Sequence, residues 1–348
     1  MDDDHGDLTP EDEFLETVAT EGFAVAAEPQ HEQPTDPEHL HLAAMAGAVV
    51  VGVLASAQAR INGGLAHVVD DPLLAAVVSF GGGLLILCVI VLLRRSTRTA
   101  LLVVLPERLR AGDLRWWQLI GGLAGALYVA CQGLAIPSLG VALFTVLIVA
   151  GTTGSSLLVD SMGLGPGGRR PVTKARVVGA VGTTVAVLIA VSGRFSTGSL
   201  ALAAVVLTVT AGFLQTFQQA VNGQVAMRTG DPLVATFINF LMGLTALVTA
   251  LGIEHLVLHH AWISPPAPWV SPILWSGGIF GIIWIMTAAR VVRPLGVLLF
   301  ALLSIGGQLL GSLVLDIVVP TPGTVVGWQL VRGVALTGAA VAFAAVRR

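Results

Sequence analysis

Residues 58–63 read Gln-Ala-Arg-Ile-Asn-Gly and residues 218–223 read Gln-Gln-Ala-Val-Asn-Gly, so the pattern Gln-x-x-x-Asn-Gly occurs twice, 160 positions apart. Each copy is followed by Asp-Pro-Leu, at 71–73 and at 231–233, and then by Phe and Gly at the same offset. After a four-residue shortening the match continues at an offset of 156, through paired Gly-Gly-x-x-Gly, Gly-Val and Ser-Leu motifs. The chain is therefore an internal duplication of one unit.

The composition shows the environment in which this duplicated unit folds. The 348 residues are 55% hydrophobic and 11% charged, with a mean hydropathy of +0.85. Soluble domains carry roughly 25% charged residues, so the composition excludes a soluble enzyme and a nucleic-acid-binding protein. A membrane helix needs about 20 apolar residues, and no alternating segments of a β-barrel are present. The sequence predicts an all-α membrane protein with ten transmembrane helices, near 43–61, 73–93, 116–136, 141–159, 177–193, 199–221, 233–253, 273–289, 297–315 and 328–346.

The acidic residues are concentrated in the N-terminal segment. Residues 1–42 contain 13 of the 21 acidic residues, neither Lys nor Arg, and few large apolar side chains. Such a segment buries too little apolar surface to offset the entropy of ordering. Its first residues also lack the basic start and apolar run of a secretory signal. We therefore expect 1–42 to be a disordered acidic tail that is not cleaved as a signal peptide.

The basic residues predict the orientation. If the ten helices alternate in direction, 15 of the 18 basic residues fall on the side of the N-terminus. The other three, Arg60, Arg194 and Arg332, fall on the opposite side. Because cytoplasmic loops carry an excess of Lys and Arg, we predict a multi-pass protein of the plasma (inner) membrane with both termini in the cytoplasm.

The duplication and the helix count together predict the architecture. Residues 43–193 and residues 194–348 each contain five of the predicted helices. Since five is odd, the second repeat enters the membrane from the side opposite to the first. Two such inverted repeats are related by a pseudo-two-fold axis in the membrane plane, which many secondary transporters use for alternating access.

The repeated motifs also resemble a known family. Gln-x-x-x-Asn-Gly, Asp-Pro-Leu, Phe-x-x-Gly, Gly-Gly-x-x-Gly and Gly-Val are similar to those of the YdcZ-type branch of the drug/metabolite transporter (DMT) superfamily, over roughly 44–192 and 203–347. The resemblance implies two fused units, a ten-helix fold like that of EamA-type transporters, and a small-molecule substrate of unsettled identity. The second half departs at its cytoplasmic loop, where Arg290 and Arg293 replace the neutral run 135–138.

Polar side chains inside the predicted helices are the candidates for a substrate site. Tyr128 is the single tyrosine, it lies near the middle of its helix, and its repeat partner is Trp284. Gln132 follows Tyr128 by one turn. We predict that these three residues line a midplane site, against the alternative that they fill the core around a satisfied hydroxyl. Other amides, which either line a polar cavity or join helices, are Gln58, Gln218, Asn239 and Gln308.

A second group of polar residues lies at predicted helix ends. Asp71 and Asp231 each precede a Pro, as helix N-caps do, and Asn62 and Asn222 suit turns or helix ends. For these four residues a role in gating stands beside simple capping.

Two further carboxylates occupy matching positions, Asp160 in the first half and Asp316 in the second. Intramembrane carboxylates often couple transport to a cation, but these two lie at predicted helix ends, so capping or pairing with Arg is the alternative. No acidic residue lies at the centre of a predicted helix, which gives no support to coupling through a central acid.

The sequence thus predicts a secondary transporter, and we expect an exporter of a small organic metabolite or drug. The alternative is a non-transporting assembly or regulatory subunit that docks through its acidic tail. The single lysine, Lys174, does not belong to a phosphate-binding Gly-Lys-Ser/Thr motif, and no catalytic, metal-binding or cofactor-binding constellation is found. The expected partners are the lipid bilayer and a small-molecule substrate. The use of a coupling ion and the choice between monomer and homodimer are left open.

Overall fold

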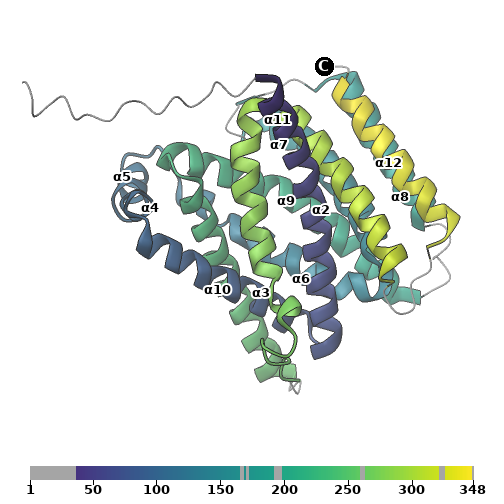
Figure 1. Ribbon diagram of the computed structural model, residues 1–348, viewed down its shortest axis with the longest axis horizontal. Coiled ribbons are helices and arrows are strands. Elements are labelled where there is room, and N and C mark those ends of the chain that lie inside the picture. Colours follow the sequence, from purple (N-terminus) through teal and green to yellow (C-terminus); the bar gives the residue numbers. More distant parts are fainter. Residues whose placement is uncertain are drawn as a thin grey trace, which may run out of the picture. The chain divides into compact units, whose positions relative to one another are not determined.

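The computed structural model describes residues 37–164, 168–169, 172–191, 198–258, 263–320 and 326–346. Nine long helices make up most of these residues (Figure 1): α2 (Pro37–Val69), α3 (Pro72–Leu93), α6 (Gly121–Leu139), α7 (Val141–Met162), α8 (Lys174–Val191), α9 (Gly198–Thr229), α10 (Pro232–Leu258), α11 (Gly277–Val318) and α12 (Trp328–Val346). Shorter elements connect them: α4 (Arg95–Thr99), the π-helix η1 (Ala100–Val104), α5 (Leu105–Arg110), and the 3₁₀ helices η2 (Trp116–Leu119) and η4 (Pro272–Trp275).

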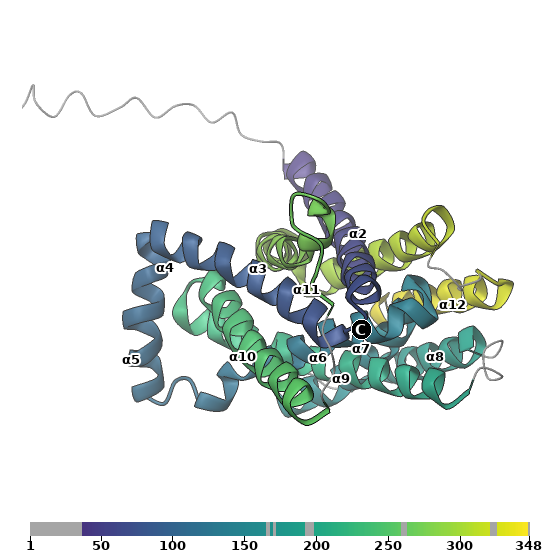
Figure 2. The same cartoon turned by 90° about the horizontal axis from the view of Figure 1, so that it is seen from below.

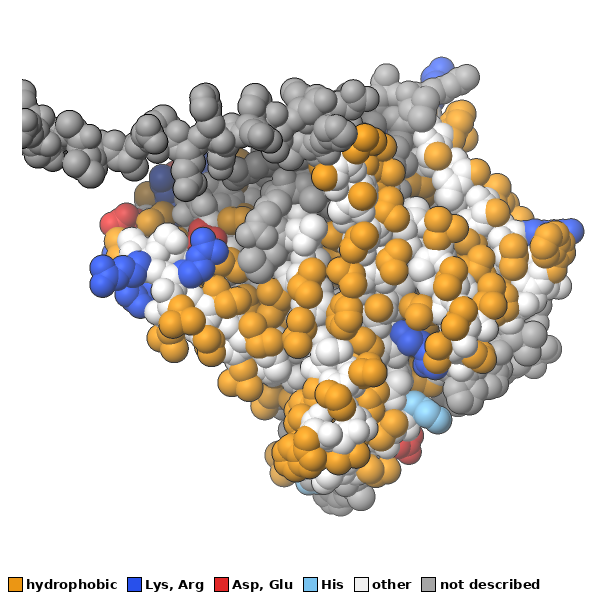
Figure 3. Space-filling model, in the orientation of Figure 1, with side chains coloured by type: hydrophobic (Ala, Val, Ile, Leu, Met, Phe, Trp, Pro, Cys, Tyr) orange, Lys and Arg blue, Asp and Glu red, His pale blue; other side chains and the backbone are white. Residues whose placement is uncertain are grey.

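The described chain is helical and apolar enough for a membrane protein. Six helices in it are long and apolar enough to cross a bilayer, and shorter apolar stretches are Leu303–Val318 within α11 and Trp328–Phe343 within α12. The described residues contain no strand. Apolar side chains cover much of the visible face of the helical part, and basic side chains gather at its left edge near α4 and α5 (Figure 3). This distribution fits a helical bundle that is surrounded by lipid.

The beginnings of α3 and α10 follow from the repeated Asp-Pro-Leu motif. Proline at the first helical position has the required φ and lacks the N–H that would be left unpaired there. The Asp71 carboxylate accepts hydrogen bonds from the N–H groups of Leu73 (2.8 Å) and Leu74 (2.9 Å). Asp231 accepts from the N–H of Leu233 (2.9 Å). The same three residues thus start the second long helix of each half.

The first helix begins earlier than the sequence predicts. α2 starts at Pro37, so 37–42 are helical although they belong to the segment predicted to be disordered. Pro37 suits a first helical position, and the leucines and alanines that follow it favour helix. The rest of the predicted tail, residues 1–36, lies outside the described residues.

The second correction concerns the predicted helices 273–289 and 297–315. The backbone is helical without a break from Gly277 to Val318, through Arg290, Arg293 and Pro294, where the sequence predicts a loop. In Figure 1 the ribbon of α11 runs in two limbs that meet at the upper edge of the bundle. A proline within a membrane helix is tolerated when neighbouring groups or a local adjustment replace the lost hydrogen bond. The other predicted segments coincide with separate helices.

Helix α7 is the centre of the packing. All nine residues from Val141 to Val149 are buried, and the side chains of Leu143, Phe144 and Leu147 are among the largest that are fully buried. A helix that is apolar and buried on every side must be surrounded by other helices. α8 and α12 lie side by side at one end of the bundle, and α4 and α5 lie at the other end (Figures 1 and 2).

Close helix contacts recur at equivalent positions of the two halves. A Cβ atom on Gly122 of α6 would overlap the backbone of Asn239 of α10. A Cβ on Gly278 of α11 would overlap the backbone of Ser79 of α3. Gly122 and Gly278 are 156 positions apart, and Ser79 and Asn239 are 160 positions apart. These are the two offsets of the sequence duplication. Each half therefore packs its third helix against the second helix of the other half.

A second pair of equivalent glycines also contacts helices of the other half. A Cβ on Gly151 of α7 would overlap the carbonyl of Val209 in α9, and a Cβ on Gly307 of α11 would overlap the carbonyl of Val49 in α2. Glycine at these positions lets the helix backbones approach closely, as small residues do in membrane bundles. The helices of the two halves are thus interleaved rather than separated into two independent bundles.

Candidate functional site

Polar side chains gather around Tyr128 on α6, and of these Gln132 is buried while Gln215 and Gln308 are half-buried. The amide side chains of Gln132, Gln215 and Gln308 surround the Tyr128 hydroxyl. Gln132 and Tyr128 come from α6, Gln215 from α9 and Gln308 from α11, so both halves contribute. Tyr128 is buried and its ring packs against Phe144 with the centroids 5.9 Å apart. We call these four polar residues the Tyr128 cluster.

The Tyr128 cluster is joined to α2 through Asn62. The Nδ2 of Asn62 donates to the Oε1 of Gln132 at 2.6 Å, and both side chains are buried. The Oδ1 of Asn62 and the Nε2 of Gln132 are also buried, and neither finds a hydrogen-bond partner among the described groups. Buried polar atoms are nearly always paired, so these two are exceptions, and the Asn62 Oδ1 lies close to the backbone of Gly277.

A second amide network lies between α9 and α10. The Oδ1 of Asn239 accepts from the Nε2 of Gln218 (2.8 Å) and from the Nδ2 of Asn222 (3.0 Å). The first half does not repeat this network, because Ser79 occupies the position equivalent to Asn239 and Asn62 donates to Gln132 instead. We call Gln218, Asn222 and Asn239 the α9–α10 amide network.

The remaining candidates for the substrate site are Gln58 on α2 and Trp284 on α11. The Nε2 of Gln58 would lie 3.0 Å from a Cβ placed on Gly281, which mirrors the approach of Gln218 to Gly125. Trp284 is half-buried on α11. That Tyr128 and Trp284 line one midplane site stays a prediction.

Gln215 is the member of the Tyr128 cluster that the sequence analysis missed. Its equivalent in the first half, at an offset of 160, is Ala55. A comparison of the repeats therefore gave no reason to select it. The signal that could have found it is an amide in an apolar helix, seven residues before Asn222.

Asp71 and Asp231 both act as caps, and Asp231 has a second role. Its Oδ2 accepts from the hydroxyl of Thr97 on α4 at 2.6 Å. Thr97 is fully buried. This contact ties the short helices α4 and α5 to the beginning of α10.

Asp316 and Asp160, which occupy equivalent positions, do different things. The carboxylate of Asp316, at the end of α11, accepts hydrogen bonds from the N–H groups of Val141 (2.9 Å) and Ala142 (2.7 Å) at the start of α7. Asp316 is 2% exposed. A carboxylate at a helix N-terminus pairs free N–H groups and is favoured by the helix dipole. It thus caps, across the two halves, the helix that begins after Gly140.

Asp160 instead forms an ion pair within its own half. Its Oδ2 lies 2.6 Å from the Nη2 of Arg176 on α8, and its side chain is 27% exposed. To mirror Asp316, Asp160 would have to cap a helix that begins after Gly296. No helix begins there, because Gly296 lies within α11. The two aspartates are therefore equivalent in sequence but not in structure.

Comparison with known proteins identifies the family. The family model described as "Putative inner membrane exporter, YdcZ" matches the chain twice, over residues 43–189 and 203–343. The chain belongs to this family. The two matched segments of this YdcZ-family protein correspond to the two halves of the duplication, and together they cover most of the chain. The protein is therefore a member of the DMT superfamily that carries two YdcZ units.

A solved structure supports the fold but adds no function. A protein described only as "Crystal structure of protein" shares 16% sequence identity with this chain, at a TM-score of 0.54. The match covers 87% of this chain and 96% of the other. No curated protein matches the chain.

Proposed function

We propose that this YdcZ-family protein is a secondary transporter that exports a small organic solute by alternating access. Its two halves are inverted five-helix repeats, with the two limbs of α11 as the third and fourth helices of the second repeat. Both termini are cytoplasmic, and the pseudo-two-fold axis lies in the membrane plane. The observation that carries this proposal is the exchange of contacts between halves, in which Gly122 meets Asn239 as Gly278 meets Ser79. Interleaved repeats of opposite direction can rock about a shared site.

The substrate site of this transporter is the Tyr128 cluster. Helices of both halves meet there, which is where alternating access requires the site to be. The unpaired Gln132 Nε2 and Asn62 Oδ1 offer one donor and one acceptor, and none of these groups is charged. The site therefore suits a solute that is recognised by hydrogen bonds and by the ring of Tyr128. Tyr128 and Gln132 are buried, so the solute reaches them when the halves separate.

Asp316 is the outer gate of the transporter. By the charge bias of the loops, the break at Gly140 and the end of α11 lie on the outer side, so the cap on α7 joins the two halves there. The described conformation is accordingly closed to the outside. Opening breaks two hydrogen bonds to a carboxylate, which a proton on Asp316 or movement of α11 would do. Asp71, Asn222 and Asp231 act as caps and network members rather than as moving gates.

A transport measurement tests the function. Proteoliposomes containing the full chain are loaded with a mixed panel of metabolites, and the released compounds are identified by mass spectrometry. We expect at least one compound to leave faster than from empty liposomes, and Gln132→Leu together with Gln308→Leu to reduce that rate at least tenfold. The unfolding temperature of the reconstituted protein shows whether it is folded. If folded protein releases no compound, the transport proposal fails.

A labelling experiment tests the gate without a known substrate. Thr145 is fully buried one turn into α7, and it is changed to Cys in a chain with Cys88→Ala and Cys131→Ala. A membrane-impermeant maleimide added outside should label it slowly, and Asp316→Asn should raise the labelling rate several-fold. The matched change Asp160→Asn should leave that rate unchanged. Equal labelling in all three chains would remove Asp316 from the gate.

A further inference from the structure

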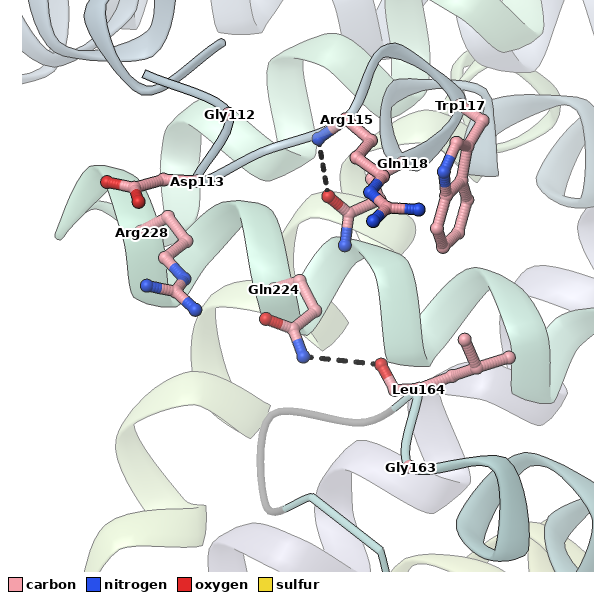
Figure 4. Close-up of a pocket in the computed structure, with 9 residues that line it drawn as sticks. All are labelled: Gly112, Asp113, Arg115, Trp117, Gln118, Gly163, Leu164, Gln224 and Arg228. Atoms are coloured by element: carbon pink, nitrogen blue, oxygen red, sulfur yellow. Dashed lines mark hydrogen bonds between the residues drawn. The ribbon is translucent and has the colours of Figure 1, made fainter.

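A polar cleft lies at the arginine-rich end of the bundle, and no residue of the Tyr128 cluster lines it (Figure 4). The segment before α6, the end of α7 and the last turns of α9 form it, and its volume is about 220 Å³. Ligand pockets for drug-sized molecules have roughly 300–1,000 Å³. This cleft therefore has room for a small ion or for one chemical group of a larger molecule.

Two arginines line the cleft, Arg115 before η2 and Arg228 at the end of α9. The carboxylate that lies with them, Asp113, forms an ion pair with Arg108 at 2.9 Å. The charge of Asp113 is therefore already balanced by a third arginine. The cleft keeps an excess of positive charge, and guanidinium groups bind oxyanions through paired, charge-assisted hydrogen bonds.

Two amides complete the polar lining. Figure 4 shows Arg228, Gln224, Gln118 and Arg115 following one another along the cleft. The Oε1 of Gln118 accepts from the backbone N–H of Arg115 at 2.7 Å, so its nitrogen, a donor, is the end left to face the cleft. The ring of Trp117 forms one wall and stacks on Phe217, with the centroids 6.1 Å apart. The Nε2 of Gln224 donates to the carbonyl of Leu164 at 3.4 Å, so the donors that face the cleft are those of the two arginines and of Gln118.

The other half of the molecule shows that the fold does not need these polar residues. The 3₁₀ helices η2 and η4 lie 156 positions apart, so the register of the two halves holds here. At the corresponding positions Arg115 is replaced by Ser271 and Gln118 by Leu274. On the helix that supplies the other wall, Val68 and Gly64 stand where α9 has Arg228 and Gln224, 160 positions later.

The matching corner of the second half is closed by apolar contact. A Cβ on Gly64 would lie 3.7 Å from the Cδ2 of Leu274. The corner between η4 and α2 is thus closed by apolar packing, whereas the corresponding corner between η2 and α9 is an open polar cleft. Cytoplasmic loops carry an excess of Lys and Arg, which accounts for the presence of arginines at this end of the bundle. This excess does not explain why two of them, together with two amides, line a concave cleft.

We propose that this cleft binds an oxyanion, a phosphate or carboxylate group, that reaches it from the cytoplasmic side. The group belongs either to a small anion in the cytoplasm or to the headgroup of an anionic phospholipid in the inner leaflet. The chemistry of recognition is the same for both, with Arg115 and Arg228 as the charged partners and Gln118 as a further donor. Binding at this cleft does not require that the chain transports anything.

The test is thermal unfolding of the purified full chain in an uncharged detergent. Sodium phosphate is compared with sodium chloride at equal ionic strength. A ligand that binds only the folded state raises its stability, so phosphate should raise the unfolding midpoint by about 2–4 °C more than chloride. Arg115→Gln with Arg228→Gln should abolish the difference. Arg110→Gln, which removes an exposed arginine outside the cleft, should keep it.

A second arm identifies the source of the group. The chain is reconstituted in vesicles of phosphatidylcholine, with or without phosphatidylglycerol, and its unfolding midpoint is measured. Stabilisation by phosphatidylglycerol that disappears in the double arginine variant assigns a lipid headgroup, whereas stabilisation by free phosphate in both kinds of vesicle assigns a soluble anion. The proposal is overturned if neither probe stabilises the wild type, or if the double variant responds as the wild type does. Loss of the response in Arg110→Gln would overturn it too.

Discussion

The two halves of this protein repeat one sequence pattern, but they differ where the third helix of each repeat meets the fourth. In the first half the chain breaks at Gly140, which has a φ of +80°, and α6 and α7 are separate helices. In the second half the equivalent Gly296 lies within α11. The break is the place where Asp316 caps α7, while Asp160 pairs with Arg176 instead. The difference teaches that the break at Gly140 comes with a cap from the other half, and that the local sequence differs as well, since Arg290 and Arg293 replace the neutral run 135–138.

The largest effect should come from removing the cap. Asp316→Ala leaves two N–H groups at the buried start of α7 without their carboxylate, and we expect the free energy of unfolding to fall by about 2–4 kcal/mol. Asp160→Ala removes a partly exposed ion pair and should cost about 1 kcal/mol or less. Chemical unfolding of both variants in detergent measures the difference. Equal losses would mean that the two aspartates are equivalent after all.

The close glycine contacts should respond alike in the two halves. Gly151→Ala and Gly307→Ala each place a Cβ against a backbone carbonyl of a neighbouring helix, so each should lower the free energy of unfolding by roughly 1–3 kcal/mol. Gly154→Ala and Gly306→Ala are the matched controls, because a Cβ there meets nothing within 4 Å. Thermal unfolding of the four variants tests this symmetry. A large loss at only one of the two contact positions would show that the halves are packed differently.

The smallest effects should come from the two amide networks. Asn62→Ala removes the hydrogen bond to the buried Gln132 and should cost about 1–2 kcal/mol. Its repeat counterpart Asn222→Ala leaves Asn239 bonded to Gln218 and should cost about 0.5 kcal/mol. The unfolding midpoints of both variants, with Asn222→Ala as the internal control, measure this. The opposite order would contradict the expectation that the hydrogen bond from Asn62 to Gln132 contributes more than the one from Asn222 to Asn239.

Much of the fold was predictable because its signals are local. The apolar runs predicted the long helices, and Asp71 with Pro72 predicted the beginning of α3, because capping depends on adjacent residues. The continuous α11 was not predictable, because Arg290, Arg293 and Pro294 locally favour a loop. Within the candidate site, Tyr128, Gln132 and Gln308 were selected as polar groups in apolar helices. Gln215 was missed, since its repeat partner is an alanine.

The sequence by itself determined that the chain is a helical membrane protein made of two copies of one unit, because hydrophobic length, helix caps and the repeat offset can be read along the chain. Only the tertiary structure decided which polar residues meet. Asp316 reaches Val141 and Ala142 from the other half, and Asn62 reaches Gln132 on another helix. These contacts depend on how the helices of the two halves interleave. Helix packing therefore gives the equivalent residues Asp160 and Asp316 different partners.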